Sequence, residues 1–184
     1  LVMGLGAQLT AWPVELVEAL VGRGFEVIRF DNRDAGLSSE CDWDPPSPVK
    51  AFLGRLFRRP VEAGYLVDDM ADDAVGLLDA LGIESAHVVG ASMGGMIAQA
   101  IAIRHERRVR SLTSIMSNPG DGSGGATAKL LVTMARQPAP SRDRAVDDAV
   151  KMFELISGPH FDPAEYRPLA EAAVARSYRP EGQA

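Results

Sequence analysis

Cysteine, basic runs and long hydrophobic runs are scarce in this sequence. Cys41 is the single cysteine among 184 residues, which excludes an internal disulfide and a thiolate metal cluster and favours a cytoplasmic location. No apolar run reaches the roughly 20 residues that a membrane-spanning helix needs, and no signal-peptide pattern is present. Because 25 acidic residues outnumber 19 basic ones, a net charge of −6 argues against binding to nucleic acid or to a membrane surface.

Motifs for metals and nucleotides are also missing. Four aspartates cluster at residues 68–73, where they favour a solvated helix start that complements the helix dipole. Residues 120–125 are rich in glycine but lack the Lys-Ser/Thr ending of a phosphate-binding loop. We therefore expect no metal and no cofactor.

Short apolar runs alternate with amphipathic stretches in the first two thirds of the chain. The expected strands are residues 1–3, 25–30, 86–89 and 109–116, and the expected helices are residues 12–22, 66–81 and 93–104. Alternation of this kind is typical of an α/β protein with a parallel sheet and helices on both of its faces.

The pattern changes after residue 120. A glycine-rich linker at residues 121–125 precedes helical segments at 126–135, 142–157 and 162–176, which prolines separate. We interpret residues 1–120 as the core and residues 121–184 as a helical lid over the edge of the sheet that carries the site.

Residues 90–94 read Gly-Ala-Ser-Met-Gly and fit the pattern G-x-S-x-G. An apolar strand runs into this motif and an apolar helix runs out of it, which is the setting of a nucleophile elbow. Small residues on either side of Ser92 let a sharp turn expose its hydroxyl. An incidental serine in a structural turn is the alternative, but the context favours Ser92 as a nucleophile.

Two backbone amides are candidate oxyanion donors. Met93 follows the serine at a helix N-terminus, where free N–H groups stabilise developing negative charge. Leu5 follows the first expected strand, and Gly4 allows a close backbone approach there. A glycine turn without a catalytic role is the alternative for residues 4–6.

These stretches resemble the α/β-hydrolase superfamily, and they are most similar to esterases of the aclacinomycin methylesterase group. The matching residues are 3–8, 27–38, 69–73 and 88–99, and residues 176–182 are similar to the lid of that group. The resemblance implies a structural clamp at Asp31 and Arg33, with Asp34 in place of the usual glycine.

The base and acid of a catalytic triad are not evident. In this fold they follow the serine in the order acid, histidine. His87 precedes Ser92, His105 ends a helix, where its charge would complement the dipole, and His160 lies between two lid helices. Asp121 is an acid in the linker. We expect instead a chain truncated at both ends, whose acid and histidine lie beyond Ala184 and which has little activity alone.

The sequence thus predicts a serine hydrolase that cleaves a small, hydrophobic carboxylic ester through an acyl-enzyme at Ser92. The same scaffold carries cofactor-free haloperoxidases, thioesterases, C–C hydrolases and hydroxynitrile lyases, so fold alone does not select the chemistry. A non-catalytic ligand-binding relative is a further alternative. Substrate identity and oligomeric state stay open.

Overall fold

A short parallel sheet lies at the centre of the core. The computed structural model describes residues 1–42, 63–119 and 141–179. Strands β1 (Ala86–Ala91) and β2 (Val109–Ile115) pair in parallel. Val2 extends the sheet on the other side of β1, because its N–H donates to the Val89 oxygen at 2.8 Å and its oxygen accepts from Ala91 at 3.0 Å. The order across the sheet is therefore Val2, β1, β2.

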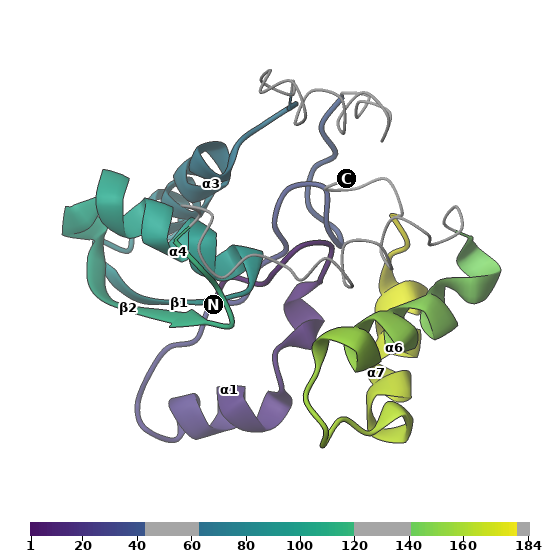
Figure 1. Ribbon diagram of the computed structural model, residues 1–184. Helices are drawn as coiled ribbons and strands as arrows, with labels where there is room; N and C mark the ends of the chain where they lie inside the picture. The colour runs from purple at the N-terminus through teal and green to yellow at the C-terminus, as the bar shows by residue number, and fades with distance from the viewer. Residues whose placement is uncertain (43–62, 120–140, 180–184) are drawn as a thin grey trace.

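Two helices cover one face of this sheet. Helices α3 (Val67–Ala80) and α4 (Met93–Arg104) lie on the same side of β1 and β2 (Figure 1). The apolar composition of α4 suits an element buried between a sheet and a second helix. The main hydrophobic cluster joins these elements through Val2, Met70, Ala71, Ala74, Val75, Val88, Ile97, Ala98 and Ile101.

Helix α1 (Val14–Val21) lies on the opposite side of the strands (Figure 1). It follows a short 3-10 helix, η1 (Leu9–Ala11), and the buried Trp12. A second 3-10 helix, η2 (Glu106–Arg108), connects α4 to β2. Helices on both sides of a parallel sheet confirm the predicted α/β architecture.

The predicted strand at residues 25–30 is wrong, and the strand at residues 1–3 is reduced to the single bridge at Val2. Residues 25–30 have β-branched and aromatic side chains, but strand formation also requires a partner with which to build a ladder. A single hydrogen bond, from the Leu1 nitrogen to the Ile28 oxygen at 2.7 Å, does not make a ladder.

The last described segment forms a helical pair. Helix α6 (Ala145–Ile156), preceded by the 3-10 helix η3 (Arg142–Arg144), packs on α7 (Pro163–Arg176). The rings of Phe153 and Tyr166 stack between them with centroids 4.2 Å apart. Both helices agree with the sequence within a few residues, whereas the helix expected at 126–135 lies outside the described residues.

None of the helices in the described ranges combines the length and the apolar character needed to span a membrane.

Candidate active site

Ser92 occupies a strained turn between β1 and α4. Its φ of 56° and ψ of −124° are a conformation that costs a non-glycine residue about 1–3 kcal/mol. The turn is held from beneath, because the Ser92 N–H donates to the Ile115 oxygen of β2 at 2.9 Å. The Ser92 side chain is exposed. This geometry is that of a nucleophile elbow.

The two glycines of the motif are required by close packing. A Cβ on Gly90 would lie 2.0 Å from the Gly94 oxygen, and a Cβ on Gly94 would lie 2.2 Å from the Val2 oxygen. Both clashes involve backbone atoms, which cannot rotate away. The G-x-S-x-G spacing therefore lets the first turn of α4 sit directly against β1 and Val2.

The loop after Val2 passes beside Ser92. A Cβ on Gly4 would lie 2.9 Å from the Ser92 Cβ and 3.3 Å from its Oγ. Leu5 is the next residue, and its side chain is exposed. Among the described residues, neither the Leu5 amide nor the Met93 amide donates a hydrogen bond to another group of the protein. Both candidate oxyanion residues therefore lie beside Ser92 in the structure. Met93 directly follows Ser92, and Leu5 directly follows Gly4, which packs on the Ser92 side chain.

None of the three histidines hydrogen-bonds Ser92. His87 is exposed on β1, with its Nδ1 2.7 Å from the Ser111 Oγ. His105 binds a side chain rather than standing free at the end of α4, because its Nε2 lies 2.6 Å from an Asp72 oxygen. His160 is exposed in the turn between α6 and α7. Asp121 lies outside the described residues.

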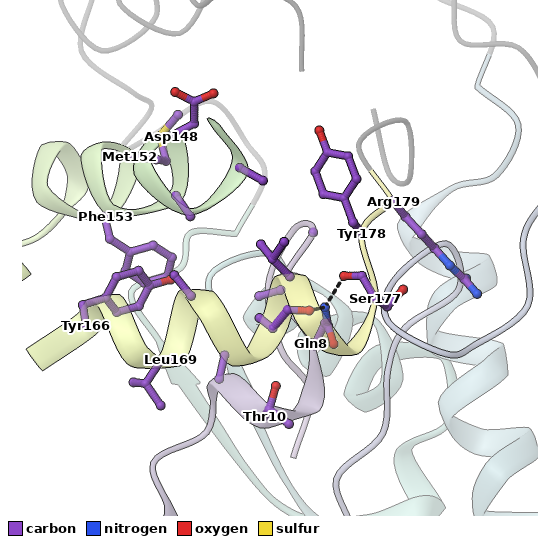
Figure 2. Close-up of a pocket in the computed structure, with 18 of the residues that line it drawn as sticks. Gln8, Thr10, Asp148, Met152, Phe153, Tyr166, Leu169, Ser177, Tyr178 and Arg179 are labelled. Carbon is purple, nitrogen blue, oxygen red and sulfur yellow. Dashed lines mark hydrogen bonds between the residues drawn. The ribbon is translucent and has the colours of Figure 1, made fainter. Parts of the chain in front are cut away.

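A cavity of about 400 Å³ lies between the loop at residues 5–11 and the helices α6 and α7 (Figure 2). Apolar side chains dominate its wall, including Leu5, Met152, Phe153, Leu169 and Val174. Ser92 does not line this cavity. Leu5, which lines the cavity, directly follows Gly4, whose backbone packs against the Ser92 side chain.

The cavity wall contains neutral polar groups at Tyr166 and Gln8 and one half-buried carboxylate, Asp148. Burial raises the pKa of Tyr166 to about 12, so its phenol is uncharged at neutral pH. The Gln8 amide donates to the oxygens of Ala173 and Ser177 at 2.8 and 2.9 Å. Figure 2 shows Gln8 pointing at Ser177, below Tyr178. The cavity is therefore suited to a largely apolar group, with one carboxylate in its wall.

Asp31 forms the clamp that the resemblance implied. Its buried carboxylate accepts hydrogen bonds from the amides of Leu9 at 2.7 Å and Leu37 at 3.0 Å. Arg33 differs, because it binds Asp73 on α3 through two bonds of 2.6 and 2.7 Å. The aspartates at residues 68–73 are thus partly ion-paired rather than only solvated.

Sequence reasoning missed the partners that complete this clamp. Arg176 of α7 donates to an Asp31 oxygen at 2.7 Å and to the Gln8 Oε1 at 2.7 Å. Burial raises the pKa of Asp31. The hydrogen bonds from Arg176 and from the amides of Leu37 and Leu9 together lower it by more than burial raises it, so the net shift is downward. The one signal was the inclusion of Gln8 and Arg176 in stretches that resemble the esterase group.

No set of three His, Cys, Asp or Glu side chains arranged to hold a metal ion occurs in the part of the chain that the structure describes.

Comparison with known proteins identifies relatives of this arrangement. A family model described as the alpha/beta hydrolase fold matches residues 1–152. A rhodomycin D methylesterase of Streptomyces peucetius is 29% identical over 91% of this chain and 58% of its own length. A 2-hydroxymuconate semialdehyde hydrolase of a Pseudomonas species is 38% identical over 54% of this chain and 38% of its own length.

A similar solved structure is a 2-hydroxy-6-oxo-6-phenylhexa-2,4-dienoate hydrolase from a Rhodococcus species. It has a TM-score of 0.64 at 17% identity, over 94% of this chain and 56% of that one. At this identity the likeness concerns the fold. The chain spans a little more than half the length of the relatives that it matches over most of its own length.

Proposed function

Because the chain belongs to the alpha/beta hydrolase fold family, we propose that it carries the nucleophile of a serine hydrolase that cleaves a carboxylic ester. In this proposal residues 1–120 form the core and residues 121–184 the lid. The observation that carries it is the exposed Ser92 on a turn with positive φ, against which the Gly4 loop packs. Strain of this kind persists where surrounding structure enforces it, as at functional sites.

The chemistry follows from the position of Ser92. Its Oγ attacks the ester carbonyl carbon, and a base takes the hydroxyl proton and delivers it to the departing alcohol oxygen as the C–O bond breaks. Water then attacks the acyl-enzyme and restores Ser92. Amides of Leu5 and Met93 bind the carbonyl oxygen while it carries negative charge, which is worth about 3 kcal/mol per donor in comparable sites.

The cavity supports a small hydrophobic substrate. Its apolar wall begins at Leu5, so an acyl or alcohol group could enter it while the carbonyl lies at Ser92. A methylesterase among the relatives agrees with an ester. The higher identity to a 2-hydroxymuconate semialdehyde hydrolase, 38% over 54% of the chain, favours C–C bond hydrolysis as the second candidate. A cytoplasmic location is part of the proposal and is supported by the lone Cys41.

Labelling with a fluorophosphonate tests the nucleophile. Because no described histidine hydrogen-bonds Ser92, we expect slow labelling, and after prolonged incubation intact-mass analysis should show one adduct on the chain, located at Ser92 by peptide mapping and absent in Ser92→Ala. Ser111→Ala is the matched control, because Ser111 is an exposed serine on β2 that lies outside the proposed machinery. An adduct that persists in Ser92→Ala, or a chain that resists the probe while folded, would sink the proposal.

Ester turnover tests the missing base. Since no described histidine contacts Ser92, we expect the 184 residues alone to hydrolyse 4-nitrophenyl esters at close to the background rate. Measurable turnover that disappears in both Ser92→Ala and His160→Ala would contradict this expectation and would identify His160 as the base. Turnover lost only in Ser92→Ala would place the base elsewhere.

A further inference from the structure

Gln8 uses its whole side-chain amide to hold the end of the lid. The Gln8 side chain is buried, and its Nε2 donates to the oxygens of Ala173 and Ser177. Its Oε1 accepts from Arg176 at 2.7 Å. Ala173 is in the last turn of α7, where its oxygen also accepts from the Ser177 N–H at 3.0 Å, and Ser177 directly follows the helix, so its own oxygen has no helical donor. A side chain of the core therefore caps a helix of the lid.

Arg176 ties the same helix end to a second core loop. Its other terminal nitrogen donates to the Asp31 carboxylate at 2.7 Å, and the Asp31 side chain is 3% exposed. The adjacent Ser177 donates its hydroxyl to the Gly36 oxygen at 2.6 Å. The end of α7 is thus fixed by charged and neutral hydrogen bonds to residues about 140–170 positions away in the sequence. Charge-assisted bonds of this kind are stronger than neutral ones.

Gln8 lies in the same short segment as a residue that packs against Ser92. Gly4, four residues earlier, packs against the Ser92 side chain. Between them the Ala7 amide donates to the Gly4 oxygen at 3.2 Å and closes a turn. One short segment therefore touches the nucleophile at its start and the lid at its end, with Leu5 between the two contacts.

We propose that Gln8 is a positioning residue that couples the placement of the lid to the geometry of the loop at residues 4–8. With the end of α7 in place, Gln8 holds this loop so that the Leu5 amide faces the space beside Ser92. With the end of α7 released, the loop is freed as well. The effect on the reaction rests on the proposed function, whereas the coupling itself does not.

Hydrogen exchange measures the coupling directly. In Gln8→Leu we expect amides of residues 4–11 and of residues 173–178 to exchange at least 10-fold faster, both together, while β1 and α4 keep their protection. Arg167→Ala is the matched control. It removes the 2.7 Å bond to Asp147 that joins α6 to α7 but leaves the junction with the core intact. We expect residues 4–11 to be unaffected in this control.

Fluorophosphonate kinetics measure the consequence for the site. We expect Gln8→Leu to lower the maximal labelling rate constant at Ser92 at least 10-fold with little change in the half-saturating probe concentration. A lower rate constant with an unchanged half-saturating concentration indicates that the loop carrying the Leu5 amide is misplaced, rather than that the probe binds less well. An unchanged rate constant, with faster exchange at residues 4–11, would overturn the role in positioning.

Three outcomes separate the hypotheses. Faster exchange in only one of the two segments, or in neither, would overturn the coupling. A wild-type chain that is never labelled would remove the proposed function, and the exchange data would still decide the coupling.

If Gln8→Leu loses protection everywhere, Arg176→Lys replaces it. This variant keeps the charge facing Asp31 but loses the planar fork, and we expect the same paired acceleration in a folded protein.

Discussion

Ser92 combines exposure with a left-handed backbone, and the residues around it explain how that combination is maintained. Among described non-glycine residues, positive φ occurs at Asp34, Ser92 and Met116. Ser92 is held from two sides, because its N–H bonds to the Ile115 oxygen of β2 and the Gly4 backbone packs on its Cβ. The strain is therefore supported by tertiary contacts, and removal of those contacts is expected to be costly.

The glycine after the nucleophile offers a test at this scale. We expect Gly94→Ala to lower the free energy of unfolding by about 3 kcal/mol or more, because the new Cβ would lie 2.2 Å from the Val2 oxygen and the backbone must move. Gly76→Ala in α3 is the matched control. No atom lies within 4 Å of its new Cβ, and alanine favours a helix by about 1 kcal/mol over glycine.

Urea unfolding of both variants provides the measurement. Equal stability of Gly94→Ala and the wild type would contradict the close contact between α4 and Val2.

Single residues also show where sequence reasoning reached its limit. Ser92, Gly90 and Gly94 were predictable, because their spacing encodes a local steric requirement between neighbouring elements. Gln8 was not, because its partners Ala173 and Ser177 are about 165 positions away and nothing local marks a buried amide. Long-range polar contacts depend on tertiary placement, which periodicity does not encode.

At the scale of elements, α4 shows how a helix without an amphipathic pattern is still positioned. Ile97 and Ile101 are 0% and 2% exposed, whereas Ile103 is 81% exposed. The helix packs against α3, β1 and β2, so most of its circumference is covered and one side remains open. Composition predicted that α4 is buried, but the orientation of its open side follows from the neighbours.

This asymmetry leads to a test with identical substitutions in one helix. We expect Ile97→Ala to destabilise the protein by about 3–4 kcal/mol, because it removes buried methylene groups and leaves a cavity. Ile103→Ala should change the free energy of unfolding by less than about 0.5 kcal/mol, since the side chain is already in solvent. Chemical denaturation of the two variants compares them directly. Similar losses would mean that Ile103 is covered in solution.

Residues 25–30 show the opposite case, in which a clear local pattern failed. The run has strand-forming side chains, and its neighbour, the segment at Leu1, contributes one hydrogen bond to Ile28. A strand is defined by its pairing, and residues 25–30 form no ladder in the structure, so composition alone overestimates their regular structure. The helices were more predictable, because their hydrogen bonds are local.

At the scale of the molecule, helices α6 and α7, which form the proposed lid, meet the core through a polar junction next to a largely apolar cavity. Asp31 lies at the centre of this junction, since it binds Arg176 of the lid and the amides of Leu9 and Leu37 in the core. A buried carboxylate with these partners stabilises the junction only while it is ionised. Acidification should therefore loosen the attachment of the lid before other parts of the structure respond.

The direction of this pH dependence follows from the downward shift in the pKa of Asp31. The stabilisation is complete above the usual aspartate pKa of about 3.9 and is lost as the pH falls through the lower pKa of the folded state. We expect Asp31→Asn to be less stable at pH 7 by about 2 kcal/mol, the scale of a hydrogen bond to a charged group, and to lose less stability on acidification.

Asp147→Asn provides the control for this measurement, because Asp147 is also ion-paired, with Arg167, but is exposed at the surface of the lid. We expect little change in stability for this variant, as for other solvent-exposed pairs. Urea unfolding between pH 7 and pH 3, combined with hydrogen exchange of residues 173–178, compares the three proteins. If Asp31→Asn and the wild type lose stability in parallel as the pH falls, protonation of Asp31 is not the first effect of acid. In that case apolar contacts, rather than the polar junction, hold the proposed lid.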